Sequence, residues 1–203
     1  MADKKKRIGI LGGTFNPVHL GHLMIAEMAS EAFDLNRVIF VPAKEPPHKE
    51  TDVIDAKYRL EMVRAAVLDN PNFVVSDVEM QREGKSYTID TLRYFHDVYG
   101  PDTEFFFIAG TDTIQNLPTW KYIEELLDMC EFIGAIRPGA TDDIGETIEW
   151  FGQRGSRIHI LEVPEMKLSA TELRHRLRHG LSTRYMLPRT VYQYIKEHKI
   201  YNT

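Results

Sequence analysis

The sequence predicts an α/β fold, a doubly wound parallel sheet followed by a small C-terminal helical subdomain from about residue 165 to 203. Three observations support this class. Short apolar runs of strand length alternate with longer segments whose apolar residues recur at helical spacing. Glycine, proline and asparagine separate most of these segments. The 203 residues suffice for one substantial α/β domain, so we predict a single domain over residues 1–203.

The first strand and the first helix flank a distinctive turn. Residues 8–11, Ile-Gly-Ile-Leu, form a short apolar run that predicts a buried strand. Residues 12–22 follow as the turn, and residues 23–33 predict a helix. Gly12 and Gly13 allow the backbone to turn sharply and to approach a ligand without an intervening Cβ.

The middle of the chain continues this alternation. Residues 37–42 predict a second strand, and a polar, proline-rich loop leads to a helix over 56–69. In that helix Leu60 and Val63 recur at helical spacing, and we expect Arg59 on the opposite, polar face. The next elements are a strand at 73–75, a helix at 88–99 that Gly-Pro terminates, and a buried strand at 104–109.

The last part of the chain completes the sheet and adds the C-terminal helices. Strands are predicted at 132–136 and 157–161, with a helix at 141–151 between them. Ser169 and Glu172 form a capping-box pattern at the start of a helix that ends near Gly180, and an amphipathic helix covers 188–198.

Composition excludes several classes of protein. The net charge of −5 gives no general electrostatic case for binding nucleic acid. No stretch approaches the ~18 apolar residues that a membrane span needs, and the basic N-terminal run does not lead into a signal peptide. Cys130, the single cysteine, excludes an intrachain disulfide and fits a reducing cytoplasm. We therefore expect a cytoplasmic protein without nucleic-acid or membrane partners, and the sequence leaves homo-oligomer formation open.

The turn at residues 12–22 has the layout of a phosphate site. Backbone N–H groups and the positive end of the helix dipole point outward where a helix begins after a strand. His19 and His22 are three residues apart, so we expect both on one face of the first helical turn, pointing towards a bound anion. Gly21 lowers helix stability by roughly 1 kcal/mol relative to alanine, which suggests a close contact at that position.

Two other interpretations of the turn remain open at this stage. It could be a structural glycine turn with two surface histidines, or half of a zinc site. Neither explains Gly-Gly-Thr directly after a strand, and zinc needs further ligands. We predict no protein metal site.

Residues 12–22, GGTFNPVHLGH, resemble the GGTFDPxHxGH signature of the nucleotidyltransferase superfamily that carries an HxGH box. Asn16 stands where many members have Asp, and both residues favour turns. The resemblance implies a Rossmann-like nucleotidyltransferase fold and the transfer of a nucleotidyl group to a phosphorylated acceptor, with release of pyrophosphate. It implies the following roles: ATP binding by Gly12, Gly13, Thr14 and Phe15, and catalysis by His19 and His22.

Residues 168–174, LSATELR, resemble the ISSTxIR box of the same superfamily. Ala170 replaces the second serine but keeps its backbone N–H. The resemblance implies that Ser169, Thr171 and Arg137 bind ATP and that Arg174 clamps the triphosphate during catalysis. Without the first box, the same pattern would indicate only a capped helix.

Three further motifs, at residues 46–49, 83–91 and 110–120, are similar to those of bacterial nicotinate mononucleotide adenylyltransferases, and the resemblance covers nearly the whole chain. It implies that the acceptor is bound by Lys49, Thr88, Gly110, Asp112, Trp120 and Lys121. Trp120 would stack on the pyridine ring, and N–H groups around Thr88 and Lys121 would hold its carboxylate. Asp112 would accept hydrogen bonds from a ribose, and Lys49 would contact a phosphate. Taken alone, Trp120 could equally be a core residue and Asp112 a helix cap.

The sequence therefore predicts an enzyme that joins ATP and nicotinate mononucleotide into deamido-NAD⁺, with Mg²⁺ accompanying ATP. Nicotinamide mononucleotide and phosphopantetheine are the alternative acceptors, and a nucleotide-binding module without turnover is the alternative from another class. Both histidines and Arg174 favour an active enzyme. The sequence contains no complete P-loop. The dinucleotide-binding fingerprint G-x-G-x-x-G is also missing, which argues against a dehydrogenase.

Overall fold

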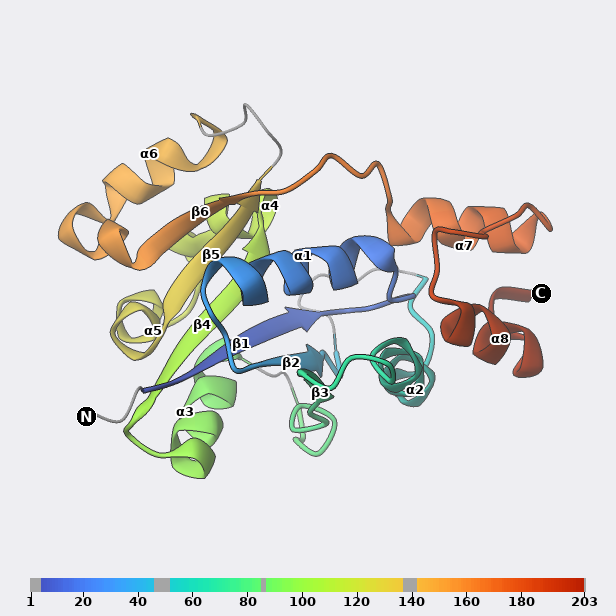
Figure 1. Ribbon diagram of the computed structural model, residues 1–203, viewed down its shortest axis with the longest axis horizontal. Helices are drawn as coiled ribbons and strands as arrows, with labels where there is room; N and C mark the ends of the chain where they lie inside the picture. The colour runs from blue at the N-terminus through green and yellow to red at the C-terminus, as the bar shows by residue number, and fades with distance from the viewer. Residues whose placement is uncertain (1–4, 46–51, 85–86, 137–141, 203) are drawn as a thin grey trace.

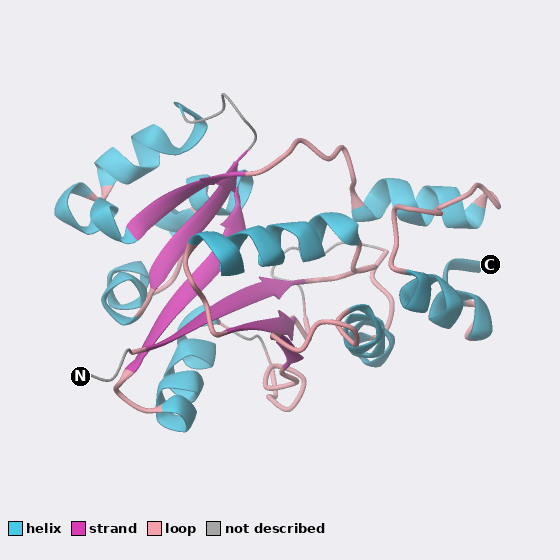
Figure 2. Ribbon diagram, in the orientation of Figure 1, coloured by secondary structure: helices cyan, strands magenta, loops and turns pink. Residues whose placement is uncertain are grey.

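Six parallel strands form one sheet in the order β3-β2-β1-β4-β5-β6, with helices on both faces (Figures 1 and 2). The computed structural model describes residues 5–45, 52–84, 87–136 and 142–202. This strand order is that of a doubly wound Rossmann-like sheet, which confirms the predicted fold class.

The strands are β1 (Lys6–Gly13), β2 (Arg37–Pro42), β3 (Phe73–Val75), β4 (Thr103–Gly110), β5 (Glu131–Ile136) and β6 (Ile158–Glu162). The α-helices are α1 (Leu20–Ala32), α2 (Ala56–Ala66), α3 (Thr88–Tyr99), α4 (Thr111–Gln115), α5 (Ile123–Met129), α6 (Asp142–Trp150), α7 (Ala170–Arg178) and α8 (Arg189–Glu197). Three short 3₁₀ helices complete the described chain: η1 (Leu117–Thr119), η2 (Gly152–Arg157) and η3 (Ile200–Asn202). No helix in the described ranges is both long enough and apolar enough to cross a membrane.

The topological switch point lies between β1 and β4. The chain runs from β1 outward to β2 and β3, then returns to place β4 on the other side of β1. Ile10 in β1 therefore pairs with Ile39 in β2 and with Phe107 in β4. In such sheets, ligands bind beyond the carboxyl ends of the strands at the switch point.

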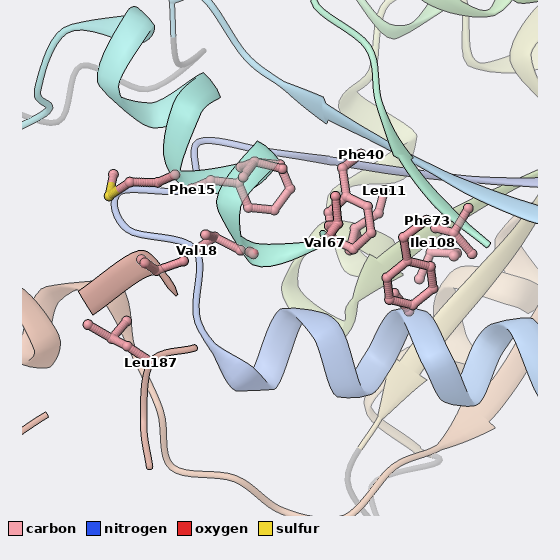
Figure 3. Packing of buried hydrophobic residues seen from close by; sticks show 14 of the residues in the cluster. Leu11, Phe15, Val18, Phe40, Val67, Phe73, Ile108 and Leu187 are labelled. Atoms are coloured by element: carbon pink, nitrogen blue, oxygen red, sulfur yellow. The ribbon is translucent and has the colours of Figure 1, made fainter. Parts of the chain in front are cut away.

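Alternating side chains of the strands divide the core into two clusters, one on each face of the sheet. Ile10 and Phe107 pack with residues of α3, α4, α5 and α6. Leu11 and Ile108 pack with residues of α1, α2, α7 and α8. In the second cluster, Figure 3 shows the rings of Phe15, Phe40 and Phe73 close together; the Phe40 centroid lies 6.0 Å from that of Phe15 and 5.2 Å from that of Phe73.

The C-terminal helices α7 and α8 contribute side chains to the second of these clusters, on the same face of the sheet as α1 and α2. Leu173 and Leu177 of α7, and Val191 and Ile195 of α8, are buried with Leu11. The two helices lie at the end of the molecule where β1 and β2 point (Figure 1). This arrangement brings a segment from the end of the sequence next to the β1–α1 turn.

Two expectations about helices were wrong. The first helix begins at Leu20 rather than residue 23, and His19, with an extended backbone, is its N-cap. Arg59 in α2 does not face solvent: it is 1% exposed. Its spacing from Met62 and Val63 puts it on the buried face, where backbone carbonyls satisfy the guanidinium.

Candidate active site

A cleft of about 660 Å³ opens at the switch point, beyond the carboxyl ends of β1 and β4. Nine residues with a predicted site role line it: Gly12, Gly13, Thr14, His19, His22, Thr88, Gly110, Asp112 and Trp120. The structure thus brings residues of the β1–α1 turn together with the start of α3 and the end of β4, although Thr88 and Gly110 follow Gly12 by 76 and 98 positions in the sequence.

The turn after β1 exposes its backbone and buries its aromatic ring. Gly12, Gly13 and Thr14 remain accessible, whereas Phe15 is 2% exposed. A Cβ on Gly13 would lie 3.0 Å from the Phe15 ring, so only glycine fits without displacement. Phe15 has φ = 50°, a left-handed conformation that costs a non-glycine residue of order 1–3 kcal/mol. Phe15 does not line the cleft, so its predicted role in ATP binding stays a prediction and can involve only its backbone.

The two histidines lie against each other at the start of α1. Their ring centroids are 3.7 Å apart in a stacked arrangement, and the backbone N–H of His19 donates to Nδ1 of His22 over 3.2 Å. A Cβ on Gly21 would lie 3.1 Å from Nδ1 of His19, which is the close contact expected at that glycine. His19 Nδ1 is buried and has no hydrogen-bond partner among the described residues.

Burial keeps both imidazoles neutral at pH 7 in this structure. It lowers the pKa of His19 to about 4. It also lowers the pKa of His22 well below 6.5, and the neighbouring charge of His19 lowers it further. Position in the sequence does not reveal this loss of water around both rings.

Arg174 is buried outside the lining of the cleft. Its Nε donates to Asp52 Oδ2 over 3.0 Å, and an Nη donates to the backbone carbonyl of Asn16 over 3.0 Å. Its side chain is 6% exposed, and Arg178 forms a second ion pair with Asp52. A direct contact between Arg174 and ATP stays a prediction, while its contact with the β1–α1 turn is a structural fact.

The second box forms a capped helix next to the cleft. Ser169 is the N-cap of α7, and its hydroxyl accepts from the Glu172 N–H over 3.2 Å, as the sequence predicted. Thr171 Oγ1 accepts from Arg174 over 3.4 Å. Leu168 lines the cleft, whereas Ser169 and Thr171 do not, so their role in ATP binding stays a prediction.

Four of the six predicted acceptor residues line the α3–β4 side of the cleft: Thr88, Gly110, Asp112 and Trp120. Trp120 follows α4 and η1. Its ring packs nearly edge-on against the rings of Phe107 and Phe132, with centroid distances of 5.7 and 6.3 Å. Thr88 is the first residue of α3, where backbone N–H groups have no partner within the helix. Lys121 is outside the cleft lining; its Nζ lies 4.7 Å from the centroid of the Tyr87 ring. Lys49 and Arg137 lie outside the described residues.

Glu79 and Thr91 were not predicted as site residues, although both line the cleft. The Thr91 hydroxyl donates to Glu79 Oε1 over 2.9 Å and accepts from Arg82 over 2.7 Å. Burial raises the pKa of Glu79, and the hydrogen bond from Thr91 opposes that rise. Thr91 belongs to a motif that the sequence singled out, but no spacing rule connects it with an acid twelve residues earlier.

No cluster of three or more His, Cys, Asp or Glu side chains within the described ranges is arranged to hold a metal ion. Asp112 and Glu79 are separate carboxylates of the cleft wall. This donor set fits Mg²⁺ as it is usually bound with nucleotides, through phosphate oxygens, water and one or two carboxylates.

Comparison with known families agrees with the geometry. The model of the cytidylyltransferase-like family matches residues 10–176. The chain belongs to this family. A protein of a Thermoanaerobacter species, named "probable nicotinate-nucleotide adenylyltransferase", is 42% identical over 98% of this chain and 96% of its own. Proteins of the same name from Moorella thermoacetica and Exiguobacterium sibiricum are 44% and 45% identical over 99% and 97% of this chain, and 94% and 100% of their own.

Two solved structures share the fold of this chain. The Plasmodium falciparum nicotinic acid mononucleotide adenylyltransferase complexed with NaAD aligns with a TM-score of 0.79, at 20% identity, over 97% of this chain and 98% of its own. A putative nicotinate-nucleotide adenylyltransferase of Vibrio parahaemolyticus aligns with a TM-score of 0.68, at 22% identity, over 97% of this chain and 95% of its own. The family resemblance inferred from the motifs is confirmed.

Proposed function

We propose that this chain transfers the adenylyl group of ATP to nicotinate mononucleotide, forming deamido-NAD⁺ and pyrophosphate. One observation carries the proposal: a single cleft collects the Gly12–Thr14 turn, both histidines and Trp120. The names of relatives with more than 40% identity over nearly the full chain support the choice of acceptor.

The reaction needs positioning and charge stabilisation rather than a covalent nucleophile. A phosphate oxygen of the acceptor attacks the α-phosphorus of ATP and forms the new P–O bond. The bond between the α-phosphorus and the bridging oxygen breaks, and its electron pair leaves with pyrophosphate. Negative charge on the transferred group is stabilised by hydrogen-bond donors held in place beforehand.

The β1–α1 turn and the histidines are the donors in this proposal. The backbone N–H of Thr14 lies between the end of a buried strand and the start of a helix, an arrangement that favours anions. Because Nδ1 of His22 accepts the His19 N–H, its proton in the neutral ring lies on Nε2, which can donate to a phosphate oxygen. The buried Nδ1 of His19, for which the described part of the chain offers no hydrogen-bond partner, also supports a polar ligand here.

The acceptor would occupy the side of the cleft near Trp120. Its pyridine ring would stack on the indole, and its carboxylate would accept from N–H groups near Thr88 and Lys121. Asp112 would accept a hydrogen bond from a ribose hydroxyl. Mg²⁺, entering with ATP, would neutralise phosphate charge, with Asp112 as a nearby carboxylate.

Pyrophosphate release decides between an active enzyme and a binding module. Purified chain, ATP and Mg²⁺ are incubated with nicotinate mononucleotide or with phosphopantetheine, and products are identified by mass spectrometry. We expect one pyrophosphate per deamido-NAD⁺ formed and none with phosphopantetheine. Binding of ATP without pyrophosphate release would support the module instead.

A further inference from the structure

Arg59 is a buried cation with no function assigned so far. It is 1% exposed, and its guanidinium donates to four backbone carbonyls. The nitrogen-to-oxygen distances are 2.8 Å to the carbonyl of Thr14, 2.6 Å to that of Ala43, 2.9 Å to that of Lys44 and 3.1 Å to that of Ile54. Among the described residues these carbonyls are its only hydrogen-bond partners. Burial lowers the pKa of the guanidinium, and Tyr201 and Asp55 oppose that shift.

These contacts join the ends of two neighbouring strands. Thr14 follows β1 directly, and Ala43 and Lys44 follow β2. The N–H of Ala43 also donates to the carbonyl of Gly13 over 2.9 Å, so the two strand ends are connected directly and through Arg59. Both Thr14 and Ala43 line the cleft, whereas Arg59 does not and thus lies behind the loops.

The contact with Thr14 determines how the next peptide group is oriented. In a trans peptide the C=O and the following N–H point in opposite directions. Since the Thr14 carbonyl is directed at Arg59 behind the loop, the N–H of Phe15 is directed to the opposite side. Phe15 has the unfavourable φ of 50°, and such a conformation persists only when its surroundings hold it.

Arg174 holds the same turn from the other side of Phe15, through the carbonyl of Asn16. Two buried guanidinium groups, from α2 and α7, therefore fix the carbonyls before and after the strained residue. Of the two, only Arg59 has backbone carbonyls as its sole described partners. No carboxylate within the described ranges is paired with its positive charge, which lies directly behind a loop that faces the cleft.

We propose that Arg59 is a positioning residue for the turn after β1, residues 12–16: it orients the Phe15 N–H towards a bound phosphate and adds positive charge behind that turn, where no described carboxylate is paired with it. This inference rests on the proposed function for the identity of the ligand. Because the proposed function places the phosphates of ATP at this turn, Arg59 should affect the binding of polyphosphate and, much less, the binding of nicotinate mononucleotide.

Inorganic tripolyphosphate tests this without requiring catalysis. Its Kd is measured by calorimetry for wild type, Arg59→Lys and Arg59→Met, after thermal unfolding has shown that each variant is folded at the assay temperature. Arg64→Lys and Arg64→Met are the matched controls, because Arg64 lies on the same helix but is exposed and paired with Glu61. We expect affinity to fall about tenfold or more for Arg59→Met, as for loss of hydrogen bonds to a charged group, and less for Arg59→Lys. The Arg64 variants should match wild type.

The kinetic constants separate positioning from a merely structural role. In the folded Arg59 variants the KM for ATP should rise with the tripolyphosphate Kd, while the KM for nicotinate mononucleotide changes little. Lower stability with unchanged Kd and unchanged KM for ATP would overturn the inference. If wild type binds tripolyphosphate in an Arg59-dependent way but releases no pyrophosphate, the proposed function fails and the inference stands.

A measurement on wild type covers the case in which Arg59→Met does not fold. In protein with ¹⁵N-labelled arginine, Arg59 and Arg174 give the guanidinium signals of the two arginines that are buried within the described ranges, and Arg59→Lys and Arg174→Lys assign them. Tripolyphosphate should shift the Arg59 signals. Signals that stay in place at saturating tripolyphosphate would contradict the proposal.

Discussion

The backbone N–H of His19 donates to Nδ1 of His22, and the two imidazole rings stack with centroids 3.7 Å apart. The histidines of the first box therefore form one unit in which the N-cap residue orients the residue three positions later. Burial keeps this unit neutral, since it lowers the pKa of His19 to about 4 and that of His22 well below 6.5. Orientation and protonation of the pair are thus coupled.

The neutral pair predicts a loss of stability in acid. The folded pKa of His19 is about 4, below the ordinary 6.5, so between these values the unfolded chain binds more protons than the folded one. Stability should fall as pH decreases from 6.5 to 4, with a contribution from His19 of roughly 3 kcal/mol. His19→Gln should show a smaller decrease, measured by denaturant unfolding at pH 7 and 4.5. Equal decreases in wild type and variant would contradict the buried, neutral assignment.

Removing the second histidine should affect turnover far more than stability. His22→Ala should lower kcat by a factor on the order of 10² or more, because it removes a donor to the transferred phosphate. Stability should fall by about 1 kcal/mol, since the His19 N–H loses its acceptor. His22→Asn, which keeps an acceptor, serves as the control for that loss. A normal kcat in folded His22→Ala would remove His22 from the chemistry.

Substitution of Arg174 should reduce both stability and the use of ATP. Its guanidinium joins Asp52 to the Asn16 carbonyl, and its removal leaves the carbonyl of buried Asn16 without this donor, at a cost of about 1–3 kcal/mol. Arg174→Ala should also raise the KM for ATP, and Arg174→Lys should recover only part of either loss, because a point charge cannot replace a planar fork. Asp52→Asn removes the carboxylate that pairs with Arg174 and Arg178 but leaves the contact of Arg174 with the Asn16 carbonyl, so it shows how much the ion pairs contribute. If ATP kinetics stay normal in a folded, destabilised Arg174→Ala, the residue is structural only.

Trp120 should contribute to acceptor binding alone. Loss of the indole in Trp120→Ala should raise the KM for nicotinate mononucleotide by about 5- to 150-fold, the range for one lost stacking contact, and spare that for ATP. The edge-on contacts with Phe107 and Phe132 mean that some stability is lost as well. Trp120→Phe keeps a stacking surface and should recover part of the affinity. An unchanged acceptor KM would return Trp120 to a packing role.

Sequence patterns were sufficient for the sheet and for the first box. Strand-length apolar runs alternating with helical periodicity predict a parallel sheet, and the structure has that sheet with its switch point at β1 and β4. Glycines directly after the first strand predict a turn that a ligand can approach, and Gly12 and Gly13 line the cleft. These features depend on local conformation and on the carboxyl ends of strands, which a sequence records directly.

The buried polar groups could not be predicted in the same way. Periodicity placed Arg59 on a polar face because it counts apolar residues and does not anticipate carbonyls that arrive from strand ends up to 45 positions away. Arg174 was predicted as a phosphate clamp, but its neighbour Asp52 lies 122 positions earlier and cannot be inferred from a helical pattern. The depressed histidine pKa values likewise depend on surroundings formed only in the folded chain.

The ratio of kcat/KM for nicotinate mononucleotide to that for nicotinamide mononucleotide, with ATP saturating, tests the central claim most directly. The carboxylate can accept from N–H groups near Thr88 and Lys121, whereas an amide turns its own N–H₂ towards those donors and leaves one unpaired. We predict a preference for the acid of roughly tenfold or more, which corresponds to one unpaired buried donor. Equal use of both acceptors, or a preference for the amide, would contradict the account.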